Sequence, residues 1–178
     1  MKKELLSHYL FLILFFFLIT LTKGWYTSPV YLYFWLGGVV GNMLPDLDHL
    51  LYIFVSRPSE LTSKRISSLI SQKEWSSALD LLYKTRRERK MPVFHTIQFQ
   101  ILFAIVAFFV VTSTGSLFGT GLVLSAMLHL AVDQADDFFA TSSISNWLVN
   151  LDLKLDRKQS SYYLFTYIIS LLIISLLF

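Results

Sequence analysis

The stretch LFGTGLVLSAMLHLAVDQADDFFA, from Leu117 to Ala140, decides the fold class of this chain. It is long and apolar enough to cross the hydrocarbon core of a bilayer as one α-helix, which takes about 20 residues. Yet it contains His129 and Asp133, and an aspartate near the centre of a membrane helix costs about 2.5–3.5 kcal/mol. We therefore expect these two side chains to face other polar groups, to face water or to hold a metal ion.

Four further apolar runs are expected to span a membrane: residues 5–22, 29–55, 93–111 and 162–178. Each should be helical, because an open strand would leave backbone groups unpaired in lipid. The chain of 178 residues is 54% hydrophobic and 16% aromatic, a composition typical of integral membrane proteins. The first run is too long for a signal peptide and lacks a small-residue cleavage site, so we interpret it as a retained anchor. The sequence thus predicts an all-α, multi-pass transmembrane bundle of about five spans, forming a single domain over residues 1–178.

Lysine and arginine residues predict the orientation of this bundle. With the N-terminus in the cytoplasm, 14 of the 15 basic residues lie inside and only Lys23 lies outside, in agreement with the positive-inside rule. The C-terminus is then external. Nine basic residues lie in the polar segment 57–90, which we predict to form one or two amphipathic helices on the cytoplasmic surface. The net charge of +3 therefore reflects membrane topology, and we expect no nucleic-acid partner.

This topology brings all four histidines of the chain to the cytoplasmic halves of their spans, together with several aspartates. Because the chain has no cysteine, a metal ion there must be held by imidazole, carboxylate, amide or water. A histidine and a carboxylate four residues apart on one helix, as in H-L-A-V-D, can bind the same ion. The predicted metal ligands are His8, Asp46, His49, His95, His129 and Asp133.

The motif LPDLDH, at residues 44–49, carries three of these polar groups on a single span. Asp46 and His49 are three residues apart and share a helix face. Asp48 points elsewhere in a regular helix, unless Pro45 breaks the helix and turns it. Three glycines of the same span, Gly37, Gly38 and Gly41, are expected to allow close helix packing.

Each polar side chain also has a structural interpretation. His8 can reach water from the membrane interface, the aspartate and histidine of LPDLDH can form a hydrogen-bonded pair, and His95 can cap its helix. Asp136 and Asp137 can be solvated residues at the end of the fourth span. The functional interpretation is favoured most clearly for His129 and Asp133, which lie deepest in the membrane.

The order of these motifs resembles the YdjM-type family of inner-membrane metal-dependent hydrolases. The family pattern has an early histidine, an LPD-x-DH motif, a THS-like motif and a late H-x-x-x-D. These parts are matched by His8, by Leu44–His49, by His95 with Thr96, and by His129 with Asp133. The resemblance covers residues 5–140 and departs from the family at Lys90, where a further histidine is often found. It implies a metal-dependent hydrolase in the inner membrane, with a more distant similarity to zinc-dependent phospholipase C.

Together these observations predict a hydrolase with a divalent metal, zinc or else manganese, that acts on the phosphoester of a lipid or lipid-linked substrate. Asp48 or Asp136 is the expected general base, and Lys90, Arg89 and Arg87 are expected to attract the phosphate. Membrane lipids are the expected partners. The motifs of zinc proteases and serine hydrolases, H-E-x-x-H and G-x-S-x-G, are absent from the sequence. Two alternatives stay open: a non-catalytic membrane metal-binding or ion-handling protein, and a metal that only joins helices.

Overall fold

The computed structural model describes residues 2–25, 29–85, 93–151 and 153–178. Within these ranges every regular element is helical, which confirms the all-α class. A π-helical turn, η2 (Tyr52–Ser56), follows α3, and a 3₁₀ segment, η4 (Ser145–Leu151), lies between α7 and α8. The α-helices are α1 (Lys2–Thr22), α2 (Tyr31–Met43), α3 (Leu47–Leu51), α4 (Leu61–Ser71), α5 (Trp75–Lys84), α6 (Ile97–Ser113), α7 (Leu117–Thr141) and α8 (Arg157–Leu176).

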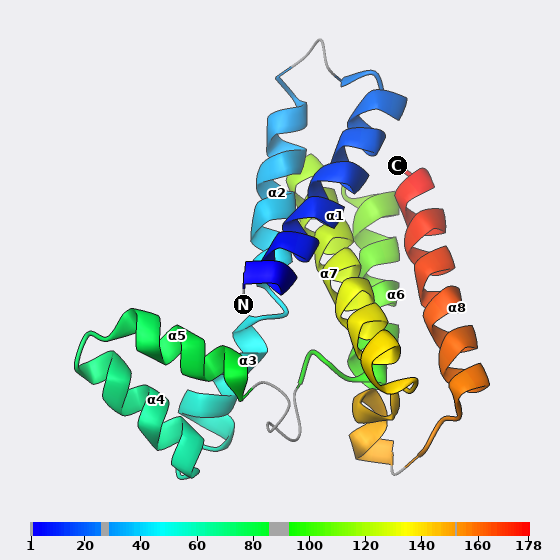
Figure 1. Ribbon diagram of the computed structural model, residues 1–178. Helices are drawn as coiled ribbons and strands as arrows, with labels where there is room; N and C mark the ends of the chain where they lie inside the picture. The colour runs from blue at the N-terminus through cyan, green and yellow to red at the C-terminus, as the bar shows by residue number, and fades with distance from the viewer. Residues whose placement is uncertain (1, 26–28, 86–92, 152) are drawn as a thin grey trace.

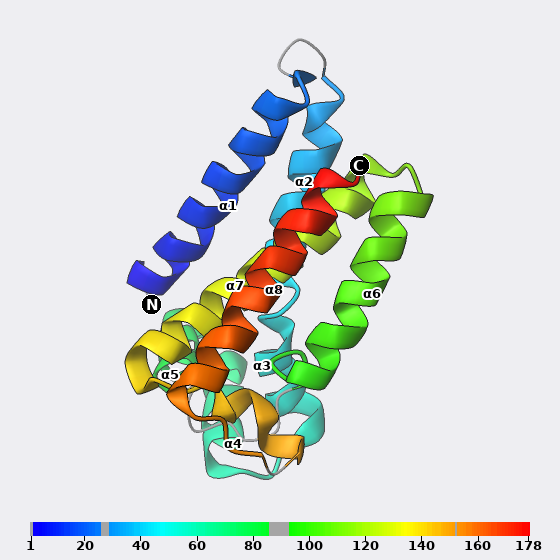
Figure 2. The ribbon, with the colours of Figure 1, turned by 90° about the vertical axis from the view of Figure 1, so that its right-hand side faces the viewer.

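The helices α1, α2, α6, α7 and α8 form an elongated bundle in which α7 occupies the middle (Figures 1 and 2). Contacts join α7 to each of the other four helices. Every residue of α7 from Val123 to Gln134 is buried, and most of the apolar ones belong to the main hydrophobic core together with aromatic side chains of α1 and α2. Because α7 is covered on all sides over this length, His129 and Asp133 are held in the interior of the bundle.

Glycines allow α2 to approach α7 closely. A Cβ atom on Gly37 would overlap the backbone carbonyl of Phe118, and one on Gly41 would overlap the carbonyl of Leu122. Gly38 is buried in the same stretch of α2. The close packing expected of these glycines is observed, and it fixes α2 against α7, the helix that carries His129 and Asp133.

The predicted second span, residues 29–55, is not one continuous helix. After α2 three residues form a turn, and α3 begins at Leu47. Pro45 lies in this turn and has no backbone N–H to donate, which disfavours it in a helix interior. The Asp48 N–H instead donates to the Pro45 carbonyl at 3.1 Å. The break turns the Asp48 side chain into the protein, where it is only 2% exposed.

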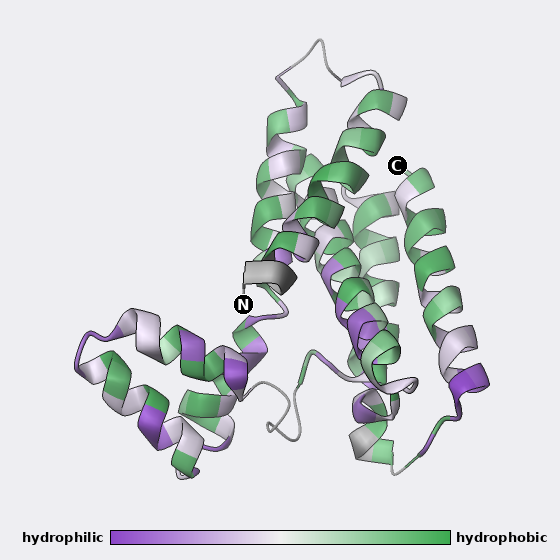
Figure 3. Cartoon of the chain, viewed as in Figure 1, coloured by the Kyte–Doolittle hydropathy of each residue, from purple (hydrophilic) through white to green (hydrophobic). Residues whose placement is uncertain are grey.

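The polar segment predicted at 57–90 contains two short helices, α4 and α5, which pack against each other. Together with η2 they bury a second, smaller core of Ile53, Ile66 and Ala78. This α4/α5 hairpin projects sideways from the lower end of the bundle in Figure 1. The bundle helices are mainly apolar, whereas the hairpin mixes polar and apolar residues (Figure 3).

The start of α6 differs from the prediction, which began the third span at Val93. The helix begins at Ile97 because Thr96 caps it, with its side-chain oxygen accepting a hydrogen bond from the Phe99 N–H at 3.2 Å. The residues before the cap are not helical. Their backbone N–H groups are therefore available to other acceptors, and those of residues 93–95 donate to the Asp48 side chain.

The start of α8 lies earlier than the predicted position 162. Asp156 and Gln159 form a capping box, in which each side chain accepts a hydrogen bond from the backbone of the other, and the helix begins at Arg157. The preceding segment η4 has no counterpart in the prediction. It buries Trp147, which is 2% exposed, against the lower part of the bundle.

By length and composition two described helices, α7 and α8, can cross a membrane. The apolar stretches Leu6–Thr22 and Ile97–Ser113 are shorter than 18 residues. The helical class is thus confirmed, two helices have the length and composition of membrane spans, and the five-span bundle stays a prediction.

Candidate metal centre

Asp133 lies where three histidines from different parts of the chain meet. Its Oδ1 atom is 3.1 Å from Nε2 of His8, and its Oδ2 atom is 3.0 Å from Nε2 of His95. The same Oδ2 is 3.3 Å from Nε2 of His129, one turn earlier on α7. All four side chains are buried, and Asp133 has no exposed surface. The structure therefore brings together predicted ligands from α1, from α7 and from the segment before α6.

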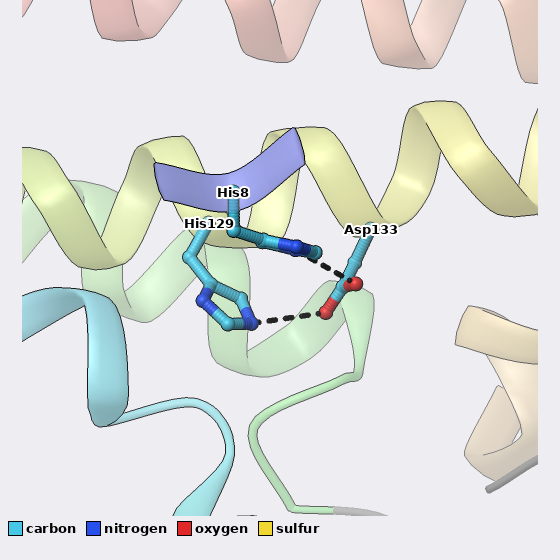
Figure 4. A group of neighbouring side chains, drawn as sticks. All are labelled: His8, His129 and Asp133. Atoms are coloured by element: carbon cyan, nitrogen blue, oxygen red, sulfur yellow. Dashed lines mark hydrogen bonds and ion pairs between the residues drawn. The ribbon is translucent and has the colours of Figure 1, made fainter. Parts of the chain in front are cut away.

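The imidazole of His129 is buried, and its nitrogen atoms are candidates for binding a metal ion. Neither ring nitrogen has a hydrogen-bond partner among the described residues, although Nε2 lies 3.3 Å from Asp133 and 3.8 Å from Oδ1 of Asp46. A buried polar group left unsatisfied costs about 1–3 kcal/mol. The His129 and His8 rings lie 4.2 Å apart and both approach Asp133 (Figure 4). A cation bound by these side chains would give the Nε2 atom of His129 a partner.

The spacing of the donor atoms fits a divalent cation. His8, His129 and Asp133 each offer one ligand atom, and these atoms lie within 4.8 Å of one another. Zinc holds imidazole nitrogen and carboxylate oxygen at about 2.0–2.2 Å, so neighbouring ligands of a tetrahedral ion lie about 3.4 Å apart. The contacts of Asp133 with the two histidines, 3.1 and 3.3 Å, are close to this separation. This buried group of two imidazoles and a carboxylate can hold a metal ion.

Asp48 orients His95 and accepts hydrogen bonds from the backbone N–H groups around it. Its oxygens accept hydrogen bonds from the N–H groups of Val93, Phe94 and His95 at 2.8, 2.6 and 3.1 Å. Its Oδ2 atom also lies 3.0 Å from Nδ1 of His95, whose Nε2 is directed at Asp133. Histidines that bind metals use the same arrangement, in which one ring nitrogen donates to a carboxylate and the other binds the ion. These contacts suit a positioning role for Asp48 better than the predicted role of general base.

Asp46 and His49, the two remaining predicted ligands, lie at the edge of the cluster. The Asp46 side chain is 52% exposed, and its Oδ1 atom is 3.8 Å from Nε2 of His129. His49 is partly buried and stacks on His95, with ring centroids 5.6 Å apart and planes inclined by 11°. Asp46 therefore connects the buried cluster to solvent, while His49 packs behind one of the central imidazoles.

Two aspartates continue the polar stripe of α7 beyond Asp133. Asp136 is exposed and lies three residues on, on the same side of the helix. Asp137 accepts a hydrogen bond at 2.9 Å from the indole N–H of Trp147, whose ring lies 5.4 Å from that of His95. The part played by Trp147 was missed by sequence reasoning. Its only signal is a large aromatic residue in the connection between two apolar runs.

A second buried polar group lies beside the cluster and was also missed. Gln134, which follows Asp133 in α7, donates from Nε2 to Oε1 of Gln100 at 2.8 Å, and Tyr163 donates its hydroxyl to the same oxygen at 2.9 Å. Gln100 and Gln134 have no exposed surface. Glutamines inside two apolar runs are the signal that identifies this group, because a buried amide requires partners.

The predicted phosphate-binding residues, Arg87, Arg89 and Lys90, lie outside the residues that the structure describes. Catalytic roles for Asp48 and Asp136 stay predictions, as does the identity of the metal. No family model, curated protein or solved structure matches the chain.

Proposed function

We propose that this protein is a membrane-embedded, metal-dependent hydrolase that cleaves the phosphoester of a lipid or lipid-linked substrate at the cytoplasmic membrane face. The observation that carries the proposal is the group of His8, His129 and Asp133, whose ligand atoms lie within 4.8 Å of one another inside an apolar bundle. The resemblance of the motif order to the YdjM-type hydrolases supports the same class of reaction.

A membrane location would account for the many apolar side chains that are exposed on the outer surface of the bundle. Leu6 of α1 is 68% exposed, Phe109 of α6 is 65% exposed and Phe165 of α8 is 64% exposed, and many neighbouring apolar side chains on these helices are exposed too. Monomeric soluble proteins rarely expose contiguous apolar patches larger than a few hundred Å². Acyl chains would cover this surface. We therefore propose five membrane segments: α1, the broken unit from α2 to η2, α6, α7 and α8.

The distribution of basic residues supports the proposed orientation. The α4/α5 hairpin, which carries Lys64, Arg65, Lys73 and Lys84, and the start of α8 lie at the same end of the bundle (Figure 1). Lys23 follows α1 at the opposite end. By the positive-inside rule the hairpin end is cytoplasmic, so that the N-terminus lies inside and the C-terminus outside. The metal centre then lies in the cytoplasmic half, near the depth of lipid headgroups.

The proposed ligands are His8, His95, His129 and Asp133, with Asp46 and His49 available to a further ion. Imidazole mixed with carboxylate favours zinc, and manganese is the alternative. A divalent ion held by these residues would activate a water molecule at neutral pH and would neutralise the charge that develops on a phosphate oxygen. In the net reaction the water oxygen bonds to phosphorus, the P–O bond to the alcohol breaks, and the leaving oxygen takes up a proton.

The remaining side chains have separate proposed roles. Asp136 suits the role of general base because it is exposed and lies one turn beyond Asp133, whereas Asp48 already accepts several hydrogen bonds. Asp48 positions His95. The basic run that contains Arg87, Arg89 and Lys90 is proposed to attract the phosphate, since it adjoins the segment that leads to His95.

The test measures metal content and hydrolysis with protein purified in detergent. We expect about one zinc ion or more per chain in the wild type and loss of most of it in His129→Ala and Asp133→Asn. The matched control is Asp156→Asn, which alters the carboxylate that caps α8 and leaves the metal bound. Hydrolysis of bis(p-nitrophenyl) phosphate and of a fluorescent phospholipid should stop with EDTA and return with added zinc.

Each result has a defined meaning. Metal that stays bound in both His129→Ala and Asp133→Asn would leave only a hydrogen-bonded polar core. Hydrolysis that survives chelation and the His129→Ala change would contradict metal-dependent catalysis. Specific metal binding without hydrolysis of either substrate would support the non-catalytic, metal-binding alternative.

A further inference from the structure

A groove of about 400 Å³ lies between α6 and α8. It is lined by Gln100, Ala104 and Phe108 of α6 and by Tyr163, Tyr167 and Ser170 of α8, among others. The two helices run side by side in the same direction (Figure 2). The groove is partly open to the outside, and its volume lies within the range of small-molecule binding sites.

One end of this groove is polar and has unused hydrogen-bonding groups. Gln100 accepts two hydrogen bonds at Oε1, from Gln134 and Tyr163, so its Nε2 atom carries the donors. That nitrogen finds no partner within the described part of the chain, although the side chain has no exposed surface. The hydroxyl of Tyr167, one turn further along α8, is likewise without a partner in the ranges described. A ligand that supplies an acceptor would satisfy these buried donors.

The rest of the groove is apolar. From Gln100 to Phe108 it extends over eight residues of α6, or about 12 Å at 1.5 Å per residue. Exposed apolar side chains lie beside its opening, including Ile101 and Ile105. A ligand that fits must therefore be elongated, apolar over most of its length and polar at one end.

The polar end of the groove is linked to the metal centre. Gln134, which holds Gln100, is the residue after Asp133 on α7. Gln100 itself lies five residues after His95. Adjacent residues of a helix point about 100° apart, so Asp133 and Gln134 direct the metal centre and the amide that holds Gln100 to neighbouring faces of α7.

We propose that this groove binds one hydrocarbon chain of a lipid, with an ester oxygen of that lipid accepting a hydrogen bond from the Gln100 amide. The chain follows α6 and α8 from the depth of the metal centre toward the opposite leaflet. The inference rests on the membrane location proposed above and names the part of a lipid substrate that lies outside the metal centre. Helices of a second copy, or bulk lipid without a preferred site, are the competing occupants.

The experiment uses the full chain in nanodiscs that contain a phospholipid with a diazirine in one acyl chain. After irradiation, mass spectrometry maps the labelled residues. We expect labelling to concentrate on the groove, at Ile101, Ile105 and Thr166. Ala104→Phe and Thr166→Trp fill the groove from opposite helices and should reduce this labelling about tenfold, the effect of losing the burial of about two methylene groups. Leu102→Phe and Phe165→Trp, which alter exposed residues outside the groove on the same two helices, should leave it unchanged.

Labelling spread evenly over the lipid-facing sides of all helices would overturn the proposal, as would groove labelling that Ala104→Phe and Thr166→Trp do not reduce. Crosslinks to a second copy at the groove would assign it to an interface instead. The zinc content of each variant is measured in parallel and should stay at the wild-type level, because the ligands lie elsewhere. If the wild-type protein binds no zinc but its groove is labelled, only the proposed metal hydrolase is contradicted. If it binds zinc but its groove is not labelled, only the proposed lipid groove is contradicted.

Discussion

The Asp48 carboxylate shows how one residue can organise a site without belonging to its innermost part. It accepts three consecutive backbone N–H groups that precede α6 and holds Nδ1 of His95. In an apolar interior those donors would otherwise lack partners, at a cost of about 1–3 kcal/mol each. The same contacts fix the ring so that Nε2 approaches Asp133. Asp48 therefore couples the local fold to the geometry of the ligands.

We predict that Asp48→Asn lowers zinc affinity by about 10–100-fold, the usual effect of removing the group that orients a metal-bound histidine. The amide has the same shape but only one acceptor oxygen, so the melting temperature of the variant is measured beside its zinc affinity to separate a loss of stability from a loss of binding. Competition with a chromophoric zinc chelator measures the affinity. Asp80→Asn is the control, because Asp80 forms an exposed pair with Lys84 on α5. An unchanged affinity in Asp48→Asn would mean that His95 is not a ligand that Asp48 positions.

At the level of whole helices, the contact between α2 and α7 decides whether the centre can form. No side chain fits between the two backbones at Gly37 or Gly41, and α2 leads into the turn at Pro45 that directs Asp48 inward. Both helices must therefore keep their register for the polar side chains to meet.

Gly41→Leu is accordingly expected to destabilise the protein by about 1–3 kcal/mol or more, as overpacking of a tight interface does, and to reduce bound zinc. The neighbouring change Val40→Leu places the same leucine side chain at a position that is 43% exposed and should have little effect. Thermal unfolding in detergent, followed by tryptophan fluorescence, compares the two variants. Equal melting temperatures would show that the α2–α7 contact tolerates a side chain at Gly41.

Across the whole molecule, polar and apolar parts are separated along the axis of the bundle. The α4/α5 hairpin and the segment η4 lie at one end, whereas the five bundle helices consist mainly of apolar residues (Figure 3). The polar cluster lies toward the hairpin end, where α3 and the start of α6 approach α7. This arrangement suits chemistry at one membrane face.

The absence of cysteine from the chain allows the orientation to be tested with single cysteine variants. We predict that Thr114→Cys, in the exposed turn between α6 and α7, reacts with a membrane-impermeant maleimide applied to intact cells. Ser71→Cys, at the exposed end of α4, should react only after the cells are opened. The opposite pattern would invert the topology, and equal reaction of both variants in intact cells would argue against a membrane-spanning bundle.

The helical class, the approximate positions of the apolar helices and the candidate ligands were all predictable from local pattern. A long apolar run has few alternatives to a helix in lipid, and polar groups such as His129 and Asp133 within such runs are conspicuous. The role of Asp48 was not predictable, because it depends on how Pro45 breaks the span. Trp147 and the group of Gln100, Gln134 and Tyr163 also escaped prediction, since their partners are distant in sequence.

The sequence by itself determined that the chain is helical and apolar and that its histidines recur at one expected depth, because hydrophobicity and residue spacing act locally along each helix. Only the tertiary structure decided which atoms meet. His8 and Asp133 are 125 residues apart in the chain, and Asp48 and His95 are 47 apart. The first contact depends on the packing of α1 against α7. The second depends on the glycine-mediated approach of α2 to α7 and on the cap that starts α6. Packing of that kind is a property of several helices together, and no single segment encodes it.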